Sequence, residues 1–212
     1  MPHRRHVAIV DDEASVRESL ALLLSTAQIE SRTFASAEDY LDSVPLDESS
    51  CVILDNQLPG LSGIGLLKRI AAAADCDTAV ILISGHGDVP TAVSAMKCGA
   101  FHFVEKPLDP EALLLTVEEA LGRTEQVRDR QTQVQEFRSR RALLTQREQE
   151  VFALLVDGLP TKLIAHRLGI TPRTTEHHRA AVMHKMQART ISHLVRMALS
   201  FGPAVGGRDR EK

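Results

Sequence analysis

The sequence lacks any apolar run near the roughly 18 residues that a membrane-spanning helix needs. After the basic first residues, the apolar stretch at residues 7–10 is too short for the core of a signal peptide. Cysteine is scarce, and Cys51, Cys76 and Cys98 show no Cys-x-x-Cys spacing, which argues against a disulfide framework. We therefore expect a cytoplasmic protein in a reducing environment, with no membrane partner.

Charge is divided unevenly along a chain whose 43% hydrophobic and 25% charged residues are typical of globular domains. Residues 1–122 hold 8 Lys and Arg against 19 Asp and Glu, a net charge of −11. Residues 123–212 hold 17 against 9, a net charge of +8. This split predicts two domains, of which the basic one is a candidate for contact with a polyanion. Uneven decoration of an ordinary surface is the alternative.

In the first half, short β-rich apolar runs alternate with helical patterns. The expected strands cover residues 7–10, the surroundings of 33–34, and residues 51–54, 79–83 and 101–104. Helical patterns include residues 16–24, and Asp109 and Pro110 form an N-cap and first-turn pair that opens a later helix. Five strands alternating with helices predict an α/β fold with a five-stranded, doubly wound parallel sheet over residues 1–122.

Polar residues follow four of these strands at their carboxyl ends. They are Asp11 and Asp12 after the first strand, Asp55 after the third, Ser84 after the fourth and Lys106 after the fifth. Ligands of open parallel sheets bind beyond these ends, so three carboxylates, a hydroxyl and an ammonium converge there. Clustered carboxylates need a hard cation such as Mg²⁺, and the set suits phosphoryl transfer to a carboxylate. Each residue alone has another explanation; the acidic pair, for instance, could cap the first helix.

This spacing resembles the receiver domain of two-component response regulators over about residues 5–121. The resemblance implies a flavodoxin-like fold in which Asp55 accepts a phosphoryl group from the phosphohistidine of a sensor histidine kinase. It implies that Asp12, Asp55 and the main-chain carbonyl of Gln57 bind Mg²⁺, with Asp11 assisting through water.

The same resemblance assigns the remaining residues of the pocket. Ser84 would bind a phosphoryl oxygen, and Lys106, expected before a cis bond to Pro107, would pair with the phosphoryl group. Phe103 stands at the position of the switch aromatic, although ordinary core packing also explains it. Ser84 replaces a more usual Thr, and the residues at Gln57 and at position 86 influence the lifetime of the acyl phosphate in receivers. That lifetime is therefore open.

The stretch that follows is rich in Arg, Gln and Glu. Residues 123–141 predict a solvated helical linker, and the apolar spacing from Val127 to Val134 leaves a coiled coil as a weaker alternative. Residues 202–212 predict a flexible tail.

Between them, residues 142–201 predict a small all-α domain. Thr145-x-x-Glu148 is a capping-box pattern that opens a helix. A short helix at residues 161–168, a turn at Gly169 and a second helix capped by Thr171 form a helix-turn-helix pattern.

The second helix has one polar face and one apolar face. At about 100° per residue, the polar face carries Arg173, Glu176, His177, Ala180 and His184. Thr175, Val182 and Met186 lie opposite and are expected to pack inward. Such a polar face suits readout of bases in the major groove, and Lys162, Arg179 and Lys185 are candidates for phosphate contacts. A helical hairpin with a solvated face is the alternative.

The motifs of residues 142–201 resemble the LuxR-type DNA-binding domain. They are Leu144-Thr-Gln-Arg-Glu, Lys162-x-Ile164-Ala165, Leu168-Gly169-Ile170 and Arg173-Thr174-x-Glu176-x-His178-Arg179. Together with the receiver they indicate a FixJ-type transcription regulator. The resemblance implies that Glu176, His177 and Ala180 face bases, and it adds His178 to the DNA-contact candidates. Thr175 and His177 depart from apolar residues usual in the family, so the DNA sequence that is read stays open.

The resemblance also implies partners. These are double-stranded promoter DNA, RNA polymerase and a second copy of the chain after phosphorylation, with activation of transcription as the expected output. An apolar stripe from Ile191 to Leu199 would support dimerisation or pack only in the core. The five histidines from His166 to His193 lack zinc-site spacing.

Two other functions compete with this interpretation. An aspartyl-phosphate phosphatase of the haloacid dehalogenase type would carry Asp-x-Asp after the first strand, whereas the acids here are adjacent. A constitutive DNA-binding protein would have a vestigial receiver, against which the intact acid, hydroxyl and lysine set argues. We therefore expect no enzyme beyond the chain's own phosphoryl transfer and hydrolysis.

Overall fold

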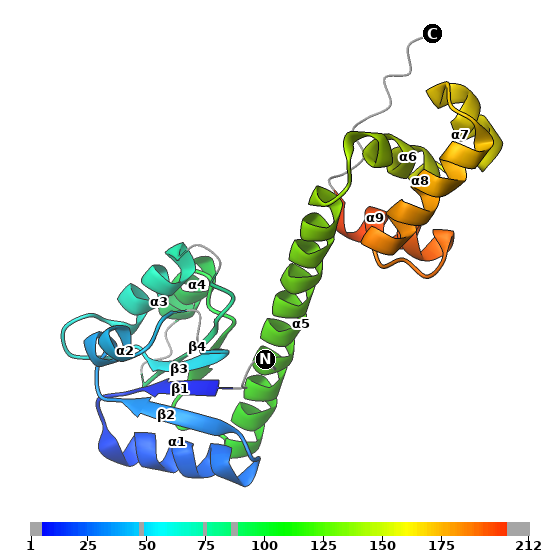
Figure 1. Ribbon diagram of the computed structural model, residues 1–212. Helices are drawn as coiled ribbons and strands as arrows, with labels where there is room; N and C mark the ends of the chain where they lie inside the picture. Colours follow the sequence, from blue (N-terminus) through cyan, green and yellow to red (C-terminus); the bar gives the residue numbers. More distant parts are fainter. Residues whose placement is uncertain (1–5, 47–48, 74–75, 86–88, 203–212) are drawn as a thin grey trace. The chain divides into compact units, whose positions relative to one another are not determined.

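The computed structural model of the chain describes residues 6–46, 49–73, 76–85 and 89–202 (Figure 1). The chain divides into two compact units, Met1–Arg128 and Asp129–Lys212. Position 86 and residues 203–212 of the expected tail lie outside the described residues. Within the described part of the chain, no helix is both long enough and apolar enough to cross a membrane.

The first unit is built on one parallel sheet, as predicted. Its strands are β1 (His6–Val10), β2 (Glu30–Phe34), β3 (Cys51–Asp55), β4 (Ala79–Ser84) and β5 (His102–Glu105). All neighbouring strands pair in parallel in the order β2-β1-β3-β4-β5. Strand order reverses between β1 and β3, so the carboxyl ends of these two strands flank the crevice where ligands of such sheets bind.

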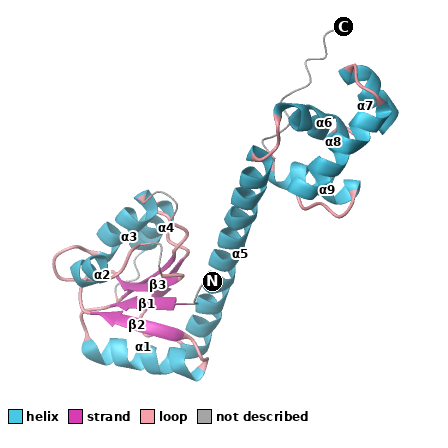
Figure 2. Cartoon of the chain, viewed as in Figure 1, coloured by secondary structure: helices cyan, strands magenta, loops and turns pink. Residues whose placement is uncertain are grey.

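Helices cover both faces of this sheet (Figure 2). They are α1 (Ala14–Thr26), α2 (Ala37–Ser43), α3 (Gly63–Ala72), α4 (Val89–Lys97) and α5 (Pro110–Ala142). Successive strand residues point to opposite faces. Val52 and Leu54 of β3 therefore pack in a core with α2, α3 and α4, whereas Cys51 and Ile53 pack in a second core with α1 and α5.

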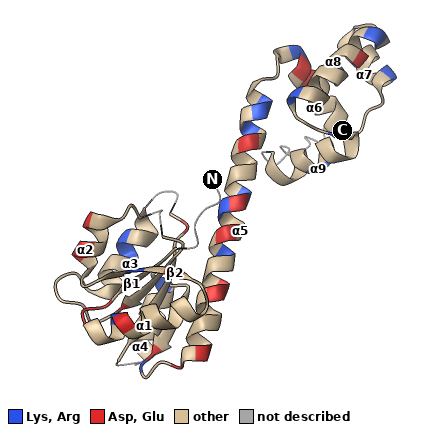
Figure 3. Ribbon diagram, turned by 60° about the horizontal axis from the view of Figure 1, so that its bottom comes forward, with Lys and Arg blue, Asp and Glu red and all other residues tan. Residues whose placement is uncertain are grey.

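Helix α5 begins where the sequence predicted. The Oδ1 atom of Asp109 accepts bonds from the N–H groups of Glu111 at 3.0 Å and Ala112 at 3.3 Å. The helix then continues through the expected linker, and much of that stretch is exposed, with charged residues of both signs (Figure 3).

Three side chains of the linker stretch make specific contacts within their own unit. The hydroxyl of Thr124 is buried and donates to the carbonyls of Ser50 at 2.9 Å and Asp77 at 3.2 Å. The guanidinium of Arg128 donates to Ser50 Oγ and to the neighbouring carbonyl of residue 49, both at 3.1 Å. Phe137 is buried in the core of the second unit. These contacts depart from the fully solvated linker that the polar composition predicted.

The second unit is all-α over its described residues. After the end of α5 it contains α6 (Gln146–Val156), α7 (Thr161–Leu168), α8 (Pro172–Lys185) and α9 (Ile191–Phe201). The capping box of Thr145 and Glu148 is present. Gly169 ends α7 with φ of 64°, a conformation that glycine adopts without strain, and Thr171 caps α8. The predicted helix-turn-helix is therefore confirmed.

Candidate functional site

Three charged side chains meet at the carboxyl edge of the sheet. Asp11 follows β1, Asp55 ends β3 and Lys106 follows β5. The Nζ atom of Lys106 lies 2.7 Å from Oδ1 of Asp55 and 3.2 Å from Oδ2 of Asp11. Both carboxylate residues are buried, with 2% and 4% of their surface exposed. The sheet thus gathers residues that are up to 95 positions apart in the chain.

The electrostatics of this cluster are unbalanced. Burial raises the pKa of the Asp11 carboxyl, and neither the Glu13 N–H, 2.8 Å away, nor the charge of Lys106 fully offsets that cost. Burial alone would lower the pKa of the Lys106 ammonium, but the hydrogen bond and charge of Asp55 raise it above its usual range. Two buried carboxylates therefore share one ammonium.

The other predicted pocket residues differ in exposure and in their contacts with this cluster. The side chain of Asp12 is exposed, and the N–H of Gln57 donates to Oδ2 of Asp55. Ser84 is 1% exposed at the end of β4, where its carbonyl accepts from the N–H of Lys106 at 2.9 Å. Phe103, on the edge strand β5, is half-buried against the core that contains α3 and α4.

The donor chemistry of the cluster fits a hard cation. Two buried carboxylates, the exposed carboxylate of Asp12 and the main-chain carbonyl of Gln57, whose N–H bonds to Asp55, supply oxygen atoms only. In the described part of the chain, however, no three acidic, His or Cys side chains gather closely enough to hold a metal ion. Lys106 supplies one positive charge for the two buried carboxylates in this arrangement. The peptide bond between Lys106 and Pro107 is cis.

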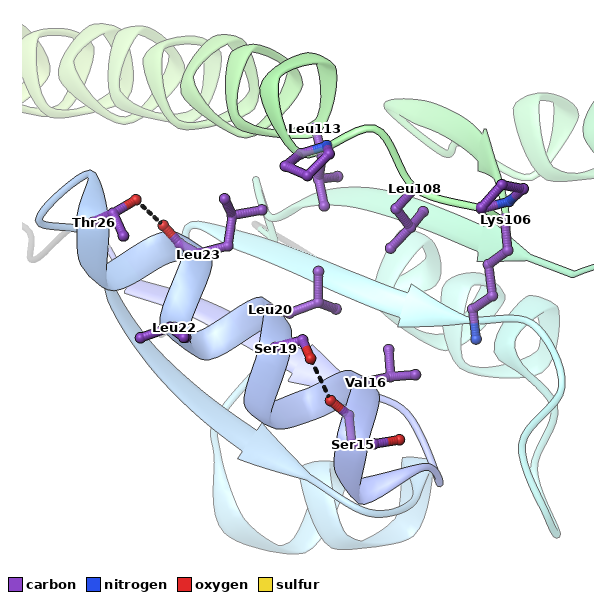
Figure 4. Close-up of a pocket in the computed structure, with 12 residues that line it drawn as sticks. Ser15, Val16, Ser19, Leu20, Leu22, Leu23, Thr26, Lys106, Leu108 and Leu113 are labelled. Atoms are coloured by element: carbon purple, nitrogen blue, oxygen red, sulfur yellow. Dashed lines mark hydrogen bonds between the residues drawn. The ribbon is translucent and has the colours of Figure 1, made fainter.

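A hollow beside the cluster has different chemistry. It has a volume of about 640 Å³ and lies between α1 and the start of α5, with Lys106 at one end (Figure 4). Leu20, Leu23 and Leu113 are among the residues of its mainly apolar lining. No carboxylate is among its described lining residues, so the acidic cluster, not this hollow, is the candidate site for a hard cation and for a carboxylate nucleophile.

In the second unit, α8 presents the predicted face. Arg173, Glu176, His177, Ala180 and His184 are all exposed. Thr175, Val182 and Met186 are fully buried on the opposite side. The predicted orientation of this helix is therefore confirmed, and its polar face is free of the domain's own core.

The other expected DNA contacts are less uniform. Lys162 is exposed, whereas His178 and Arg179 are half-buried. The Nζ atom of Lys185 lies 2.6 Å from Oε2 of Glu148, a residue that is only 6% exposed. Lys185 therefore forms an ion pair within its own domain. No spacing rule in the sequence pointed to this pair, whose members are 37 positions apart.

Two family models match the chain. The model described as the response regulator receiver domain matches residues 7–118, and the model described as bacterial regulatory proteins of the luxR family matches residues 142–198. The chain belongs to the two-component response regulators. It is of the FixJ type, a phosphorylation-controlled DNA-binding transcription regulator whose receiver implies a histidine kinase as partner.

Relatives and solved structures agree with this assignment. The transcriptional regulatory protein FixJ of Azorhizobium caulinodans is 46% identical over 205 residues, which cover 96% of each chain. The structure of the response regulator StyR has a TM-score of 0.80 at 37% identity and covers 92% of this chain and 98% of that one. Full-length FixJ from B. japonicum, at 40% identity, has a TM-score of 0.57 and covers 94% and 98%.

Proposed function

We propose that Asp55 is the phosphoryl acceptor of this response regulator. A carboxylate oxygen of Asp55 forms the bond to phosphorus while the bond from phosphorus to the histidine nitrogen of the kinase breaks. The supporting observation is the meeting of Asp55, Asp11 and Lys106 at the carboxyl edge of the sheet. Lys106 then pairs with the transferred phosphoryl group, and the Ser84 hydroxyl binds one of its oxygens.

Mg²⁺ is the proposed cofactor, held by Asp12, Asp55 and the carbonyl of Gln57 with help from Asp11. When bound, it neutralises negative charge on the phosphoryl oxygens. The sharing of one ammonium by the buried carboxylates of Asp11 and Asp55 supports this assignment, because an added cation would supply the second positive charge. We also propose that the chain ends its own phosphorylated state by hydrolysis, in which water attacks phosphorus, the bond to the Asp55 oxygen breaks and inorganic phosphate leaves.

Phosphorylation is proposed to act through Ser84 and Phe103. Ser84 moves toward the phosphoryl group, and the half-buried Phe103 turns inward and changes the surface formed by α4 and β5. Two receivers then pair, which places two α8 helices on promoter DNA as a homodimer that recruits RNA polymerase and activates transcription. Phosphorylation need only stabilise the active conformation by a few kcal/mol relative to the resting one, because such a shift reverses a two-state balance.

The test uses the full chain with Mg²⁺ and acetyl phosphate, followed by intact-mass and DNA-binding measurements. We expect one added phosphoryl group and tighter binding to duplexes selected from a random pool. Asp55→Asn keeps the size of the side chain and removes the nucleophile, so both effects should vanish. Persistence of both effects in Asp55→Asn would refute the assignment. Equal DNA affinity with and without phosphorylation would leave a constitutive DNA-binding protein.

A further inference from the structure

An arginine of α1 is bonded to the loop that carries the acidic pair. The Nη1 atom of Arg17 donates to the main-chain carbonyls of Asp11 at 2.7 Å and Asp12 at 2.9 Å. Arg17 is the fourth residue of α1 and is half-buried. Side chains in helices lean toward the N-terminus, so this guanidinium reaches back over the loop between β1 and α1.

Arg17 does not stabilise α1 through its position near the N-terminus of the helix. A helix N-terminus carries partial positive charge and disfavours a nearby cation. Among the described residues, α1 has no acidic side chain in its first turn, and its N-cap residue Glu13 makes no side-chain capping bond. What the guanidinium gains there is a pair of charge-assisted bonds to two successive carbonyls.

These bonds complete the fixation of the acidic loop. The N–H of Asp11 donates to the carbonyl of Phe34 at 3.2 Å, and the N–H of Glu13 donates to Oδ1 of Asp11 at 2.8 Å. With Arg17 holding the carbonyls, the peptide groups of Asp11 and Asp12 are restrained from the sheet side and from the helix side. The main chain sets the direction in which each Cα–Cβ bond leaves the loop, so this restraint limits the positions that both carboxylates can reach.

We propose that Arg17 is a positioning residue, which holds the acidic pair in the orientation that binds a divalent cation without touching the cation itself. This inference rests on the proposed function of the same site. Residues that orient metal ligands typically change metal affinity by about 10–100-fold when they are removed.

The experiment compares Arg17→Met, Arg17→Lys and the wild type as full chains, with Mg²⁺ binding measured by titration calorimetry. Arg17→Met keeps the aliphatic stem and loses the donors, so its Kd for Mg²⁺ should rise about tenfold. Arg17→Lys keeps a donor that can bridge the two carbonyls, so its Kd should stay within about threefold of wild type. Arg138→Met, at an exposed position of α5 in the second unit, removes the same charge without changing the receiver and should leave the Kd unchanged.

A second readout separates positioning from general damage. With acetyl phosphate, Arg17→Met should be phosphorylated slowly at low Mg²⁺ and at the wild-type rate at saturating Mg²⁺, because its ligands are intact. A wild-type Kd in Arg17→Met, or a defect that persists at saturating Mg²⁺, would overturn the inference. If Arg17→Met does not fold, a Kd in Arg17→Lys more than about tenfold above wild type would overturn it as well. If the wild type itself neither binds Mg²⁺ nor is phosphorylated, the proposed function fails instead.

Discussion

Each unit of the chain has a lysine bonded to a buried carboxylate, but the two contacts differ in kind. In the receiver, Lys106 is shared between Asp55 at 2.7 Å and Asp11 at 3.2 Å. In the DNA-binding unit, Lys185 bonds to Glu148 alone at 2.6 Å. The pKa of Asp11 is raised by burial, whereas the hydrogen bond from Lys185 lowers the pKa of Glu148.

The difference follows from burial and neighbouring charge, because Asp11 also accepts two hydrogen bonds, from Lys106 and from the N–H of Glu13, yet its burial outweighs them. Glu148 accepts a bond from Lys185 and another from the N–H of Thr145 at 2.7 Å, both on its Oε2 atom. Asp11 and Asp55 instead divide one ammonium and repel each other. The receiver therefore retains excess negative charge. This charge favours the binding of a cation, and it leaves a carboxylate able to act as a nucleophile toward a phosphoryl group. In the DNA-binding unit the charge is satisfied, and the pair joins the start of α6 to the end of α8.

The largest expected effect is the loss of the satisfied pair. Glu148→Ala removes both the partner of Lys185 and half of the capping box, so it should lower the unfolding free energy of the second unit by about 2–4 kcal/mol. Glu150→Ala removes a surface carboxylate of the same helix and should cost no more than about 1 kcal/mol. Scanning calorimetry of the full chain measures the change, and hydrogen exchange assigns the transition to α6 and α8. Equal effects of the two variants would show that the contact between Glu148 and Lys185 stabilises the second unit no more than a surface ion pair does.

The corresponding change in the receiver should have the opposite sign. Asp11→Asn removes a buried charge whose cost is not offset, so we expect the unfolding midpoint of the receiver to rise by about 2–4 °C. The same variant should bind Mg²⁺ more weakly. Calorimetry of the full chain without added Mg²⁺ tests the first expectation. A lower midpoint would show that Lys106 satisfies Asp11 as fully as Lys185 satisfies Glu148.

The sequence predicts the parts of the structure that depend on local pattern. The parallel sheet follows from alternating apolar runs, and the buried and exposed faces of α8 follow from helical periodicity. The carboxyl edge follows from topology, because every strand of a parallel sheet ends on the same side. For that reason the meeting of Asp11, Asp55 and Lys106 could be predicted without any contact information.

Contacts between distant surfaces could not be predicted in this way. Lys185 lies in a basic helix and was a natural candidate for phosphate contact, yet its partner Glu148 is set by the packing of α6 against α8. Thr124 and Arg128 belong to a polar stretch with no visible period, and only the position of α5 against residues 49–50 shows their role. The contact of Arg17 does have a sequence signal nearby, since this arginine lies one helical turn after the start of the helix that follows the acidic pair.

As pH falls, the contributions of Glu148 and Asp11 to the folding stability should change in opposite directions. The lowered pKa of Glu148 gives stability that is present above about pH 4.5 and is lost as pH falls through the folded-state value. The raised pKa of Asp11 means that its ionised form costs stability at neutral pH, and protonation relieves that cost as pH falls. Glu148→Gln resembles the protonated side chain, so its deficit against wild type should shrink from pH 7 to pH 3. The advantage of Asp11→Asn should shrink over the same fall. Unfolding midpoints of both variants and the wild type, measured from pH 7 to pH 3, test these two expectations. A difference from wild type that does not change with pH would contradict the direction of the pKa shift for that carboxyl.

The smallest effect concerns whether Lys185 also serves DNA. A side chain that contacts a phosphate contributes about 0.9 to the slope of log affinity against log salt concentration. Lys162→Ala, at an exposed phosphate-contact candidate of α7, should reduce this slope by about that amount for the phosphorylated chain on a random duplex. Lys185→Gln should leave the slope unchanged, because the Lys185 ammonium is held 2.6 Å from Glu148. A drop of similar size in Lys185→Gln would mean that the lysine leaves Glu148 when DNA binds, and the two lysine contacts would then both be exchangeable.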